Sequence, residues 1–387
     1  MAESLTWSAA QWERVNREVT EAFDKANVVG KFLPKYGPLP DSAEYVKDET
    51  LNYALDELVD VGSPGTQLSV SDDTSLKLFN LTVHVVLSRE QVSEESLSSA
   101  LLAFRRGANM LAQAEDRLVF RGHDKANVAK AQQVRDDAKV ALAEAQKSLD
   151  DKTKDLDTAR AAKEVEIKVG ATDAVLANAV RAEVAAQASV STAEGVFAKA
   201  KDDLTIAIEK LRDEEVNQSF GNPSRKGLAD KTSQFKQEKV DVTTEEKASE
   251  DLVRAVAAAT AQLENDFHPG PFACVLGTAL FKAAHRPAGD GLVLPAERIK
   301  PMLNTNSATV TGRERLLFQC GQLPKSTGVV VALAGSDIDL VIATPPRVEL
   351  LQITARAKYL FRVYEKFIWR VKDPRSAIVL VPDPPTP

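Results

Sequence analysis

The spacing of apolar residues divides the chain into segments of different periodicity. Near the N-terminus, apolar side chains recur at helical spacing from Trp12 to Phe23, and Ser8 is a suitable N-cap. This segment is therefore predicted to be a helix. Three prolines between residues 34 and 40 exclude a continuing helix and predict an extended arm.

Residues 41–122 predict a long loop, a strand and a long helix. The sequence Gly62-Ser63-Pro64-Gly65 is typical of the tip of a hairpin loop between strand-like segments. Residues 78–87 alternate as a strand does, and a helix is expected from Ser93 to Phe120. Its apolar stripe consists of Leu97, Leu101, Phe104, Ala108, Leu111 and Leu118.

Residues 124–216 have a distinct composition, with 22 alanines, no proline and Phe197 as the single aromatic residue. Their heptad pattern predicts an antiparallel two-helix coiled coil that turns at Gly170, with arms of about 65–70 Å. The heptad residues are Val128, Leu142, Leu149 and Leu156 before the turn, and Leu176, Val190, Phe197, Leu204 and Leu211 after it. Charged residues at the seam are expected to weaken it locally, namely Lys152, Lys163, Glu183 and Lys201.

The remaining residues return to a mixture of helix and strand patterns, so the fold class is α+β. A helix is predicted over residues 252–263. Strands are predicted over residues 271–276, 329–333, 339–343, 359–371 and 378–381. The proline-rich residues 382–387 are expected to be exposed.

The overall composition indicates a soluble cytoplasmic protein. The formal net charge is −7, which does not favour binding to nucleic acid or to an anionic membrane. No apolar stretch approaches the ~20 residues of a membrane-spanning helix. Residues Met1–Leu5 show no basic region followed by an apolar run, so no signal peptide is expected. Cys274 and Cys320 are interpreted as buried, reduced thiols.

Catalytic and metal-binding signatures are not found in the sequence. There is no phosphate-binding glycine loop and no nucleophile elbow, and the four histidines do not have metal-ligand spacing. Glu115 and Asp116 are adjacent on a helix and point about 100° apart, so they do not form a catalytic dyad. Ion pairs with Arg105, Arg117 or Arg121 are expected instead. We therefore predict no enzyme activity, no catalytic residue, no metal and no cofactor.

Six stretches outside the hairpin resemble the family 1 encapsulins, the shell proteins of bacterial nanocompartments. They are residues 32–39 (FLPKYGPL), 83–89 (VHVVLSR), 112–122 (AQAEDRLVFRG), 270–276 (GPFACVL), 335–341 (GSDIDLV) and 361–374 (FRVYEKFIWRVKDP). They occur in the order that the family has them. The hairpin lies between the end of the predicted long helix and a Gly227-Leu228 pair that resembles the next landmark of the family.

The resemblance implies the tailed-phage major-capsid-like fold and a closed icosahedral homo-oligomer. The implied parts are an N-terminal helix and arm (1–40) and an extended loop with a peripheral domain and spine helix (41–122). They are followed by the inserted coiled-coil hairpin (123–217) and an axial domain (218–345). The last segment (346–387) returns to the peripheral and extended-loop region and ends in the tail. Many copies would enclose a cargo enzyme, with pores for small solutes.

The resemblance also implies two functional surfaces. One is an inner groove for the C-terminal targeting peptide of the cargo, with candidates Trp12, Val15, Val19, Phe32, Leu33, Tyr36 and Leu39. The alternative is that these residues pack the arm onto its own domain. The other is a loop that lines five-fold pores, with Arg286, Gly289, Asp290 and Gly291, where a ring of aspartates would favour cations. Flavin, which some members bind, is not expected, because no matching aromatic residue is evident in the extended loop.

The sequence departs from the family pattern at Ser336, Ile338, Lys366 and Trp369, and in the hairpin itself. We expect the hydrophilic hairpin to project from the outer face of the shell, because packed copies would crowd the lumen. A prophage-type major capsid protein and a non-shell coiled-coil adaptor are the alternative functions. Formation of a very large particle separates both shell functions from the adaptor.

Overall fold

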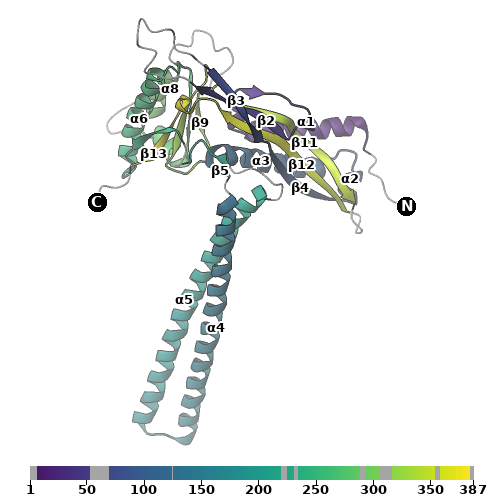
Figure 1. Ribbon diagram of the computed structural model, residues 1–387. Helices are drawn as coiled ribbons and strands as arrows, with labels where there is room; N and C mark the ends of the chain where they lie inside the picture. The colour runs from purple at the N-terminus through teal and green to yellow at the C-terminus, as the bar shows by residue number, and fades with distance from the viewer. Residues whose placement is uncertain are drawn as a thin grey trace. The chain divides into compact units, whose positions relative to one another are not determined.

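The computed structural model describes residues 7–52, 69–123, 125–218, 225–230, 234–287, 293–304, 316–353 and 358–383. The chain forms two compact units, which are treated separately below. One comprises residues 1–123 and 220–387, and the other residues 124–219. The first unit contains two sheets with their helices, and the second is a helical hairpin (Figure 1).

The first sheet has four strands in the order β1-β11-β12-β4. These strands are β1 (Lys35–Tyr36), β4 (Phe79–Ser88), β11 (Ile338–Ile353) and β12 (Lys358–Val371). The β1 strand pairs in parallel with β11, and the other pairs are antiparallel. The N-terminal arm therefore joins a sheet whose long strands come from the C-terminal part of the chain.

Helices α1 (Ala9–Ala26) and α3 (Ser98–Arg121) pack on this sheet (Figure 1). The predicted N-cap is confirmed, because Ser8 and Gln11 form a capping box at the start of α1. All six residues of the predicted stripe of α3 are buried. Their burial follows from the 3.6-residue period of the helix, which places them on one face.

The long helix begins five residues later than predicted, at Ser98 instead of Ser93. Leu97 has a φ of 52°, a left-handed conformation that does not continue a right-handed helix. A separate short helix, α2 (Arg89–Ser93), precedes it and has its own capping box. The stripe that starts at Leu97 gives no sign of this break.

The second sheet has five strands in the order β7-β13-β10-β8-β9. They are β7 (Lys236–Val240), β8 (Phe272–Leu276), β9 (Leu317–Gln319), β10 (Gly328–Ala332) and β13 (Ala377–Pro382). The three central strands match the predicted strands and are mostly or wholly buried. The edge strands β7 and β9 were not predicted, since both are short and carry polar residues.

Three helices accompany this sheet: α6 (Glu245–Asn265), α7 (Thr278–Ala284) and α8 (Pro295–Leu303). The face of α6 with Leu252, Val256 and Leu263 packs into a hydrophobic core of its own. This core is separate from the larger one, which holds α1, α3 and the first sheet. Both native cysteines are buried and reduced, as predicted.

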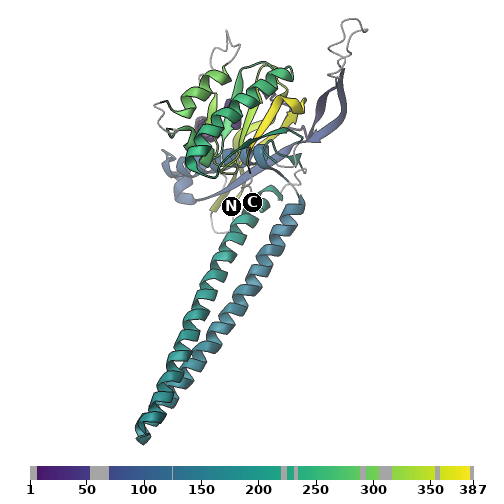
Figure 2. The ribbon, with the colours of Figure 1, turned by 90° about the vertical axis from the view of Figure 1, so that its left-hand side faces the viewer.

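Two strands, β2 (Tyr45–Asn52) and β3 (Ser69–Lys77), form an antiparallel ribbon. They flank the predicted hairpin tip Gly62-Ser63-Pro64-Gly65, which itself lies outside the described residues. The side chains of β3 are largely exposed. Figure 2 shows this ribbon from a second side, where its two strands again run next to each other.

Two very short strands bring together the two chain segments that border the hairpin. They are β5 (Gly122–His123) and β6 (Arg225–Lys226), in which His123 pairs with Arg225. Gly122 has a φ of +77°. A Cβ on Gly227 would lie 2.2 Å from the backbone nitrogen of Gly122. Glycine is required at both positions, because the two backbones touch here.

The second unit consists of α4 (Lys125–Val169) and α5 (Asp173–Gln218), which lie side by side in both views (Figures 1 and 2). The chain turns at Gly170, whose φ is +69°. The predicted seam residues whose side chains are described are buried or half-buried, namely Leu142, Leu149, Leu156, Leu176, Val190, Phe197 and Leu204; the side chains of Val128 and Leu211 lie outside the described part of the chain. The most buried side chains of this unit are Ala145, Leu156, Val190, Ala193 and Ala207. Periodicity thus predicted the hairpin correctly.

Two of the four charged seam residues meet across the helices. The Lys163 Nζ lies 2.7 Å from a Glu183 carboxylate oxygen. Arg160 approaches the same carboxylate at 3.4 Å. Opposite charges from the two helices therefore form a cross-helix ion pair at this level.

Candidate functional site

The N-terminal helix is fixed to its own domain by a group of four aromatic side chains. The Trp7 ring lies 5.0 Å from Trp12, 6.2 Å from Phe104 and 5.2 Å from Phe361, measured between centroids. The Trp7 indole nitrogen also donates a hydrogen bond to the backbone oxygen of Val92 at 2.9 Å. Edge-to-face and stacked rings of this kind add to the stabilisation from burial. The sequence interpretation did not include Trp7, which precedes the helical pattern.

The turn after α1 is held by the side chain of Asp116 on α3. Its carboxylate accepts hydrogen bonds from the backbone N–H groups of Val28 and Val29, each at 2.9 Å. These groups belong to the start of a 3₁₀ turn, Val29–Lys31. Asp116 therefore caps the turn from another helix, and the arm begins at a fixed point of the core.

Glu115, the neighbour of Asp116, faces a second buried glutamate. Its side chain lies beside that of Glu365 on β12, and Asn27 donates a hydrogen bond to Glu115 Oε1 at 2.8 Å. Both glutamates are completely buried. Burial raises the pKa of Glu115 and of Glu365, and the nearby Glu115 raises that of Glu365 further. The pair therefore binds a proton more strongly than exposed carboxyls do.

The expected ion pairs of Glu115 and Asp116 with arginines are not what the structure shows. Both carboxyls point into the core toward Asn27, the turn after α1 and Glu365, whereas Arg105 pairs with Glu18 at 2.8 Å. Burial raises the pKa of Asp116 to about 8. The prediction failed because it considered neighbours on the helix, whereas Glu365 lies 250 positions away in the sequence.

A buried arginine anchors the base of the β2–β3 ribbon. Arg370 of β12 forms two hydrogen bonds with the Asp339 carboxylate of β11, at 2.9 and 2.6 Å, and an ion pair with Glu49 of β2 at 3.0 Å. Lys372 contacts both carboxylates, at 3.2 and 3.3 Å. Arg370 is 1% exposed. Bidentate contacts between a guanidinium and a carboxylate fix the orientation of the two groups as well as their position.

The seven groove candidates do not form one continuous surface. Val15, Val19, Phe32 and Leu33 are 0–2% exposed and belong to the hydrophobic core of their own protomer. They thus pack the arm onto its domain, which is the alternative that the sequence left open. These four residues could contact a targeting peptide directly only if the arm adopted a conformation other than the one described.

The other three candidates are accessible but lie in different places. Trp12 is half-buried in the aromatic group on α1. Tyr36 is 51% exposed, and the Arg370 guanidinium lies 4.9 Å from its ring centre. The backbone N–H of the half-buried Leu39 donates a hydrogen bond to the oxygen of Ile342 at 3.0 Å. Tyr36 and Leu39 therefore follow the edge of the first sheet, and Trp12 lies on α1.

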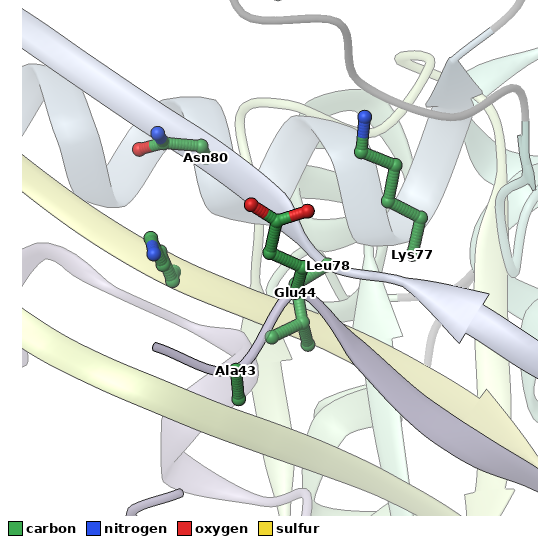
Figure 3. A pocket seen from close by; sticks show the side chains of 6 residues that line it. Ala43, Glu44, Lys77, Leu78 and Asn80 are labelled. Atoms are coloured by element: carbon green, nitrogen blue, oxygen red, sulfur yellow. The ribbon is translucent and has the colours of Figure 1, made fainter. Parts of the chain in front are cut away.

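A small polar pocket of about 140 Å³ lies where the β2–β3 ribbon meets β4 (Figure 3). Figure 3 shows Lys77 pointing away from Leu78, with the Glu44 side chain near Asn80. Lys366 completes the lining and donates a hydrogen bond to the backbone oxygen of Asp41 at 3.0 Å. A volume of this size holds a few water molecules and no cofactor.

The candidate pore loop is only partly described. Gly289, Asp290 and Gly291 lie outside the described residues. Arg286 is exposed at the end of α7 and forms an ion pair with Glu245 at the start of α6. Both line a pocket of about 410 Å³ between these helices and residues Lys325 and Ser326.

A charged histidine stabilises the segment between the two sheets. The Nδ1 atom of His268 lies 3.1 Å from Asp337, and its Nε2 lies 3.3 Å from Asp373. Burial lowers the pKa of His268, but the interactions with both carboxylates outweigh it and raise this pKa to about 9. His268 is therefore a cation at neutral pH and links the ends of β11 and β12.

The described part of the chain contains no group of three or more histidine, cysteine or acidic side chains arranged to hold a metal ion. None of its helices is long and apolar enough to cross a membrane. Burial raises the pKa of both cysteine thiols to about 12, so neither is a ready nucleophile. The buried polar groups described above connect segments of the fold, and none lies in a pocket that could hold a substrate.

Comparison with known proteins gives these features a context. The model of a family described as "encapsulating protein for peroxidase" matches residues 3–167 and 220–368. The chain belongs to this family of encapsulin shell proteins.

A curated encapsulin relative aligns with part of the chain. The type 1 encapsulin shell protein EncA of Myxococcus xanthus (strain DK1622) is 28% identical over 127 residues. This alignment covers 33% of the chain and 40% of the relative, so the chain spans about two-fifths of the relative's length.

Solved structures show the fold of the encapsulin chain. A virus-like particle from Pyrococcus furiosus has a TM-score of 0.50 at 10% identity, covering 96% of this chain and 99% of its own. The capsid of Myoviridae phage XM1 has a TM-score of 0.47 at 9% identity, covering 91% and 89%. We assign the capsid-like fold from the first of these. The predicted family and fold class are thus confirmed.

Proposed function

We propose that this chain assembles into a closed icosahedral shell that encloses a cargo enzyme in the cytoplasm, with pores for small solutes. The observation that carries the proposal is the match to the encapsulin family model over residues 3–167 and 220–368, which include most of α4. The shell itself has a structural role and takes no part in catalysis.

The β2–β3 ribbon supports assembly on physical grounds. It exposes apolar side chains, among them Tyr45 at 57% and Val70 at 59%. A two-stranded ribbon is only marginally stable in water without further packing. Neighbouring copies in a shell would cover these side chains and pair with the ribbon's edges. The Arg370–Asp339–Glu49 contacts would keep its base in a fixed direction during assembly.

The targeting peptide of the cargo is proposed to bind along the accessible part of the arm, with Trp12 and Leu39 as contacts. Both are half-buried apolar residues beside the large hydrophobic core. A fluorescent protein that carries the C-terminal residues of the enzyme encoded beside the shell gene is a suitable probe. We expect it to copurify with particles, and less of it with a Leu39→Glu variant that still assembles.

The pore is proposed to be lined by the loop that follows Arg286 and contains Gly289, Asp290 and Gly291. A ring of Asp290 side chains would attract cations by direct electrostatic interaction. An Asp290→Lys variant should then slow the entry of a divalent cation into assembled particles. Equal entry rates for both proteins would exclude this role.

Size-exclusion chromatography and negative-stain electron microscopy of the purified full chain test the shell directly. Closed, uniform particles of megadalton mass are expected under gentle conditions. A monomer or dimer under the same conditions would contradict the proposal. A portal-bearing, DNA-filled particle would instead indicate a phage capsid protein.

A further inference from the structure

The pocket of about 410 Å³ between α6 and α7 lies at one edge of the second sheet. Strands β7, β13 and β8 run in the same direction and end at this edge, whereas β10 starts there. Among the lining residues, Val242 follows β7 and Thr278 follows β8. Lys325 and Ser326 line the pocket as well and precede β10. Since β13 lies between β7 and β10, lining residues stand on both sides of the place where β13 ends.

The pairing of β13 directs the chain toward this pocket. Pro382 is paired with Val240 of β7, and the backbone N–H of Asp383 donates a hydrogen bond to the Val240 oxygen at 2.8 Å. In this register the next residue along the chain is level with Val242, which lines the pocket. On the other side, the antiparallel pairing with β10 places Ser326, also a lining residue, level with Pro382. The chain that leaves β13 therefore starts between two lining segments.

The residues that follow Asp383 are Pro-Pro-Thr-Pro, residues 384–387, and are called the proline tail. An extended proline-rich segment rises about 3.1 Å per residue, so the proline tail can span about 12 Å, which is enough to cross the pocket. Pro382 and Asp383 are half-buried, which differs from the exposure predicted for residues 382–387. The chain thus packs against its surroundings up to the point where the proline tail begins.

The hydrogen-bonding groups of the proline tail and of the pocket are complementary. Proline has no backbone N–H, so the proline tail offers a carbonyl acceptor at every residue but a backbone donor only at Thr386. The pocket instead carries cationic donors at its rim, namely Lys282, Arg286 and Lys325. Of the lining residues that the structure describes, only Glu245 is acidic, and it is paired with Arg286. A segment rich in acceptors and poor in donors matches such a rim.

The floor of the pocket is apolar and suits proline rings. Ala248, Leu280 and Ala283 line it and are buried, and Val242 is half-buried. A proline-rich segment is already close to its extended bound conformation, so it loses little conformational entropy when it binds to an apolar surface. A small inorganic anion would contact the cations of the rim but leave the apolar floor uncovered.

We propose that residues 384–387 of the same chain occupy this pocket, with the proline rings on its apolar floor and the backbone oxygens facing Lys282 and Lys325. The proline tail then acts as a strap that joins α6 and α7 across the edge where β7, β13 and β8 end. This contact lies within one protomer, so it does not depend on the proposed shell and can be tested whether or not the chain assembles.

Cross-linking of the full chain with a short bifunctional maleimide tests the contact. Thr386→Cys combined with Ala279→Cys, an exposed lining residue, should give a link within one chain. The control combines Thr386→Cys with Gln237→Cys, an exposed residue of β7 on the side of Asp383 away from the pocket, and should give about tenfold less. Equal yields, or no link to residue 279, would overturn the proposal. Links between two chains would assign the pocket to a second copy and overturn it as well.

Substitutions at the rim test the polar part of the contact. In the Thr386→Cys and Ala279→Cys background, Lys282→Glu together with Lys325→Glu should lower the yield about fivefold, because carboxylates cannot donate hydrogen bonds to the carbonyl groups of the proline tail. Lys282→Arg together with Lys325→Arg keeps the donors and should keep the yield. An unchanged yield in the glutamate variant, or an equal loss in the arginine variant, would contradict the proposed contact.

Removal of the proline tail tests the pocket without introduced cysteines. In a chain that ends at Asp383, the backbone amides of α7 and of residues 325–327 should exchange hydrogen faster, because the pocket loses its cover. The amides of α4 and α5 belong to the other compact unit and serve as the internal control, with no change expected. Unchanged exchange in α7, or a similar increase in α4 and α5, would overturn the proposal. Electron microscopy of the same samples reports shell formation separately.

Discussion

At the residue scale, the buried carboxyls are the most unusual feature of the protomer. Glu115 and Glu365 share a site that excludes water, and Asp116 lies next to it. A carboxyl whose pKa is higher in the folded state binds its proton more tightly there than in the unfolded state. Its contribution to stability is complete below the unfolded pKa and decreases as the pH rises toward the folded pKa.

The first prediction concerns the pH dependence that follows. The pKa of Asp116 is raised from 3.8 to about 8, so the protein should lose stability progressively across this window. Glu365→Gln should raise the free energy of unfolding at neutral pH by about 1–2 kcal/mol, because it removes an acid that must stay protonated. Thermal unfolding between about pH 5 and pH 9 measures both effects.

The exposed Glu13 provides the control for this substitution. Glu13→Gln should leave the unfolding temperature and its pH dependence nearly unchanged. If Glu365→Gln destabilised the protein at every pH, protonation of Glu365 would not be the source of the pH dependence.

The second prediction concerns Arg370. Arg370→Ala would leave Asp339 buried without its main partner, which costs about 3–5 kcal/mol for a pair of this kind. The matched control on the same strand is Arg362→Ala, which breaks an exposed pair with Glu349 and should cost less than about 1 kcal/mol. Denaturant unfolding compares the two. Similar losses would show that Arg370 does not anchor the ribbon.

These residues also show what a sequence pattern could not predict. The stripe of α3 was predicted because its residues repeat within one helix, and local geometry determines which side they occupy. Glu115 and Arg370 depend on partners in distant segments, so their environment follows from the fold. A signal did exist in β12, where Glu365 and Arg370 interrupt a largely apolar strand.

At the scale of elements, periodicity predicted the long helices and the central strands, but not their ends. The N-terminal helix and the two hairpin helices repeat over many turns, so single exceptions did not hide them. Edge strands β7 and β9 have three to five residues each and little apolar periodicity. The pairing of β1 with β11 joins segments about 300 residues apart, which no local pattern can indicate.

The third prediction concerns the seam of the hairpin. Glu183→Ala should remove the contacts with Lys163 and Arg160 and leave these two cations of α4 facing α5 without a carboxylate. We expect a loss of about 0.5–1 kcal/mol in local stability. Hydrogen exchange should become faster for amides near residues 160–187 of the full chain. The exposed Glu144→Ala is the control, and equal rates for both variants would refute a role for the pair.

At the scale of the whole molecule, the two chain segments that border the hairpin are already adjacent. His123 and Arg225 are direct partners across the β5–β6 pair. An Asn-Gly dipeptide is the preferred two-residue link between directly opposed strand residues. The fourth prediction is that a chain in which Asn-Gly replaces residues 124–224 still forms particles of the same size. Electron microscopy measures this, and failure to assemble would assign the hairpin a part in shell closure.

The fifth prediction concerns the side of the shell on which the hairpin lies. Its surface is hydrophilic along α4, and in the lumen many copies would compete with the cargo for space. We therefore propose that it projects outward, where a protease can reach it. Limited proteolysis of assembled particles should cut within residues 124–219 while the particles stay intact on a density gradient. The Asn-Gly variant lacks the target and should resist, which shows that the cuts fall in the hairpin. A hairpin that survives in intact particles but is cut after disassembly would lie inside.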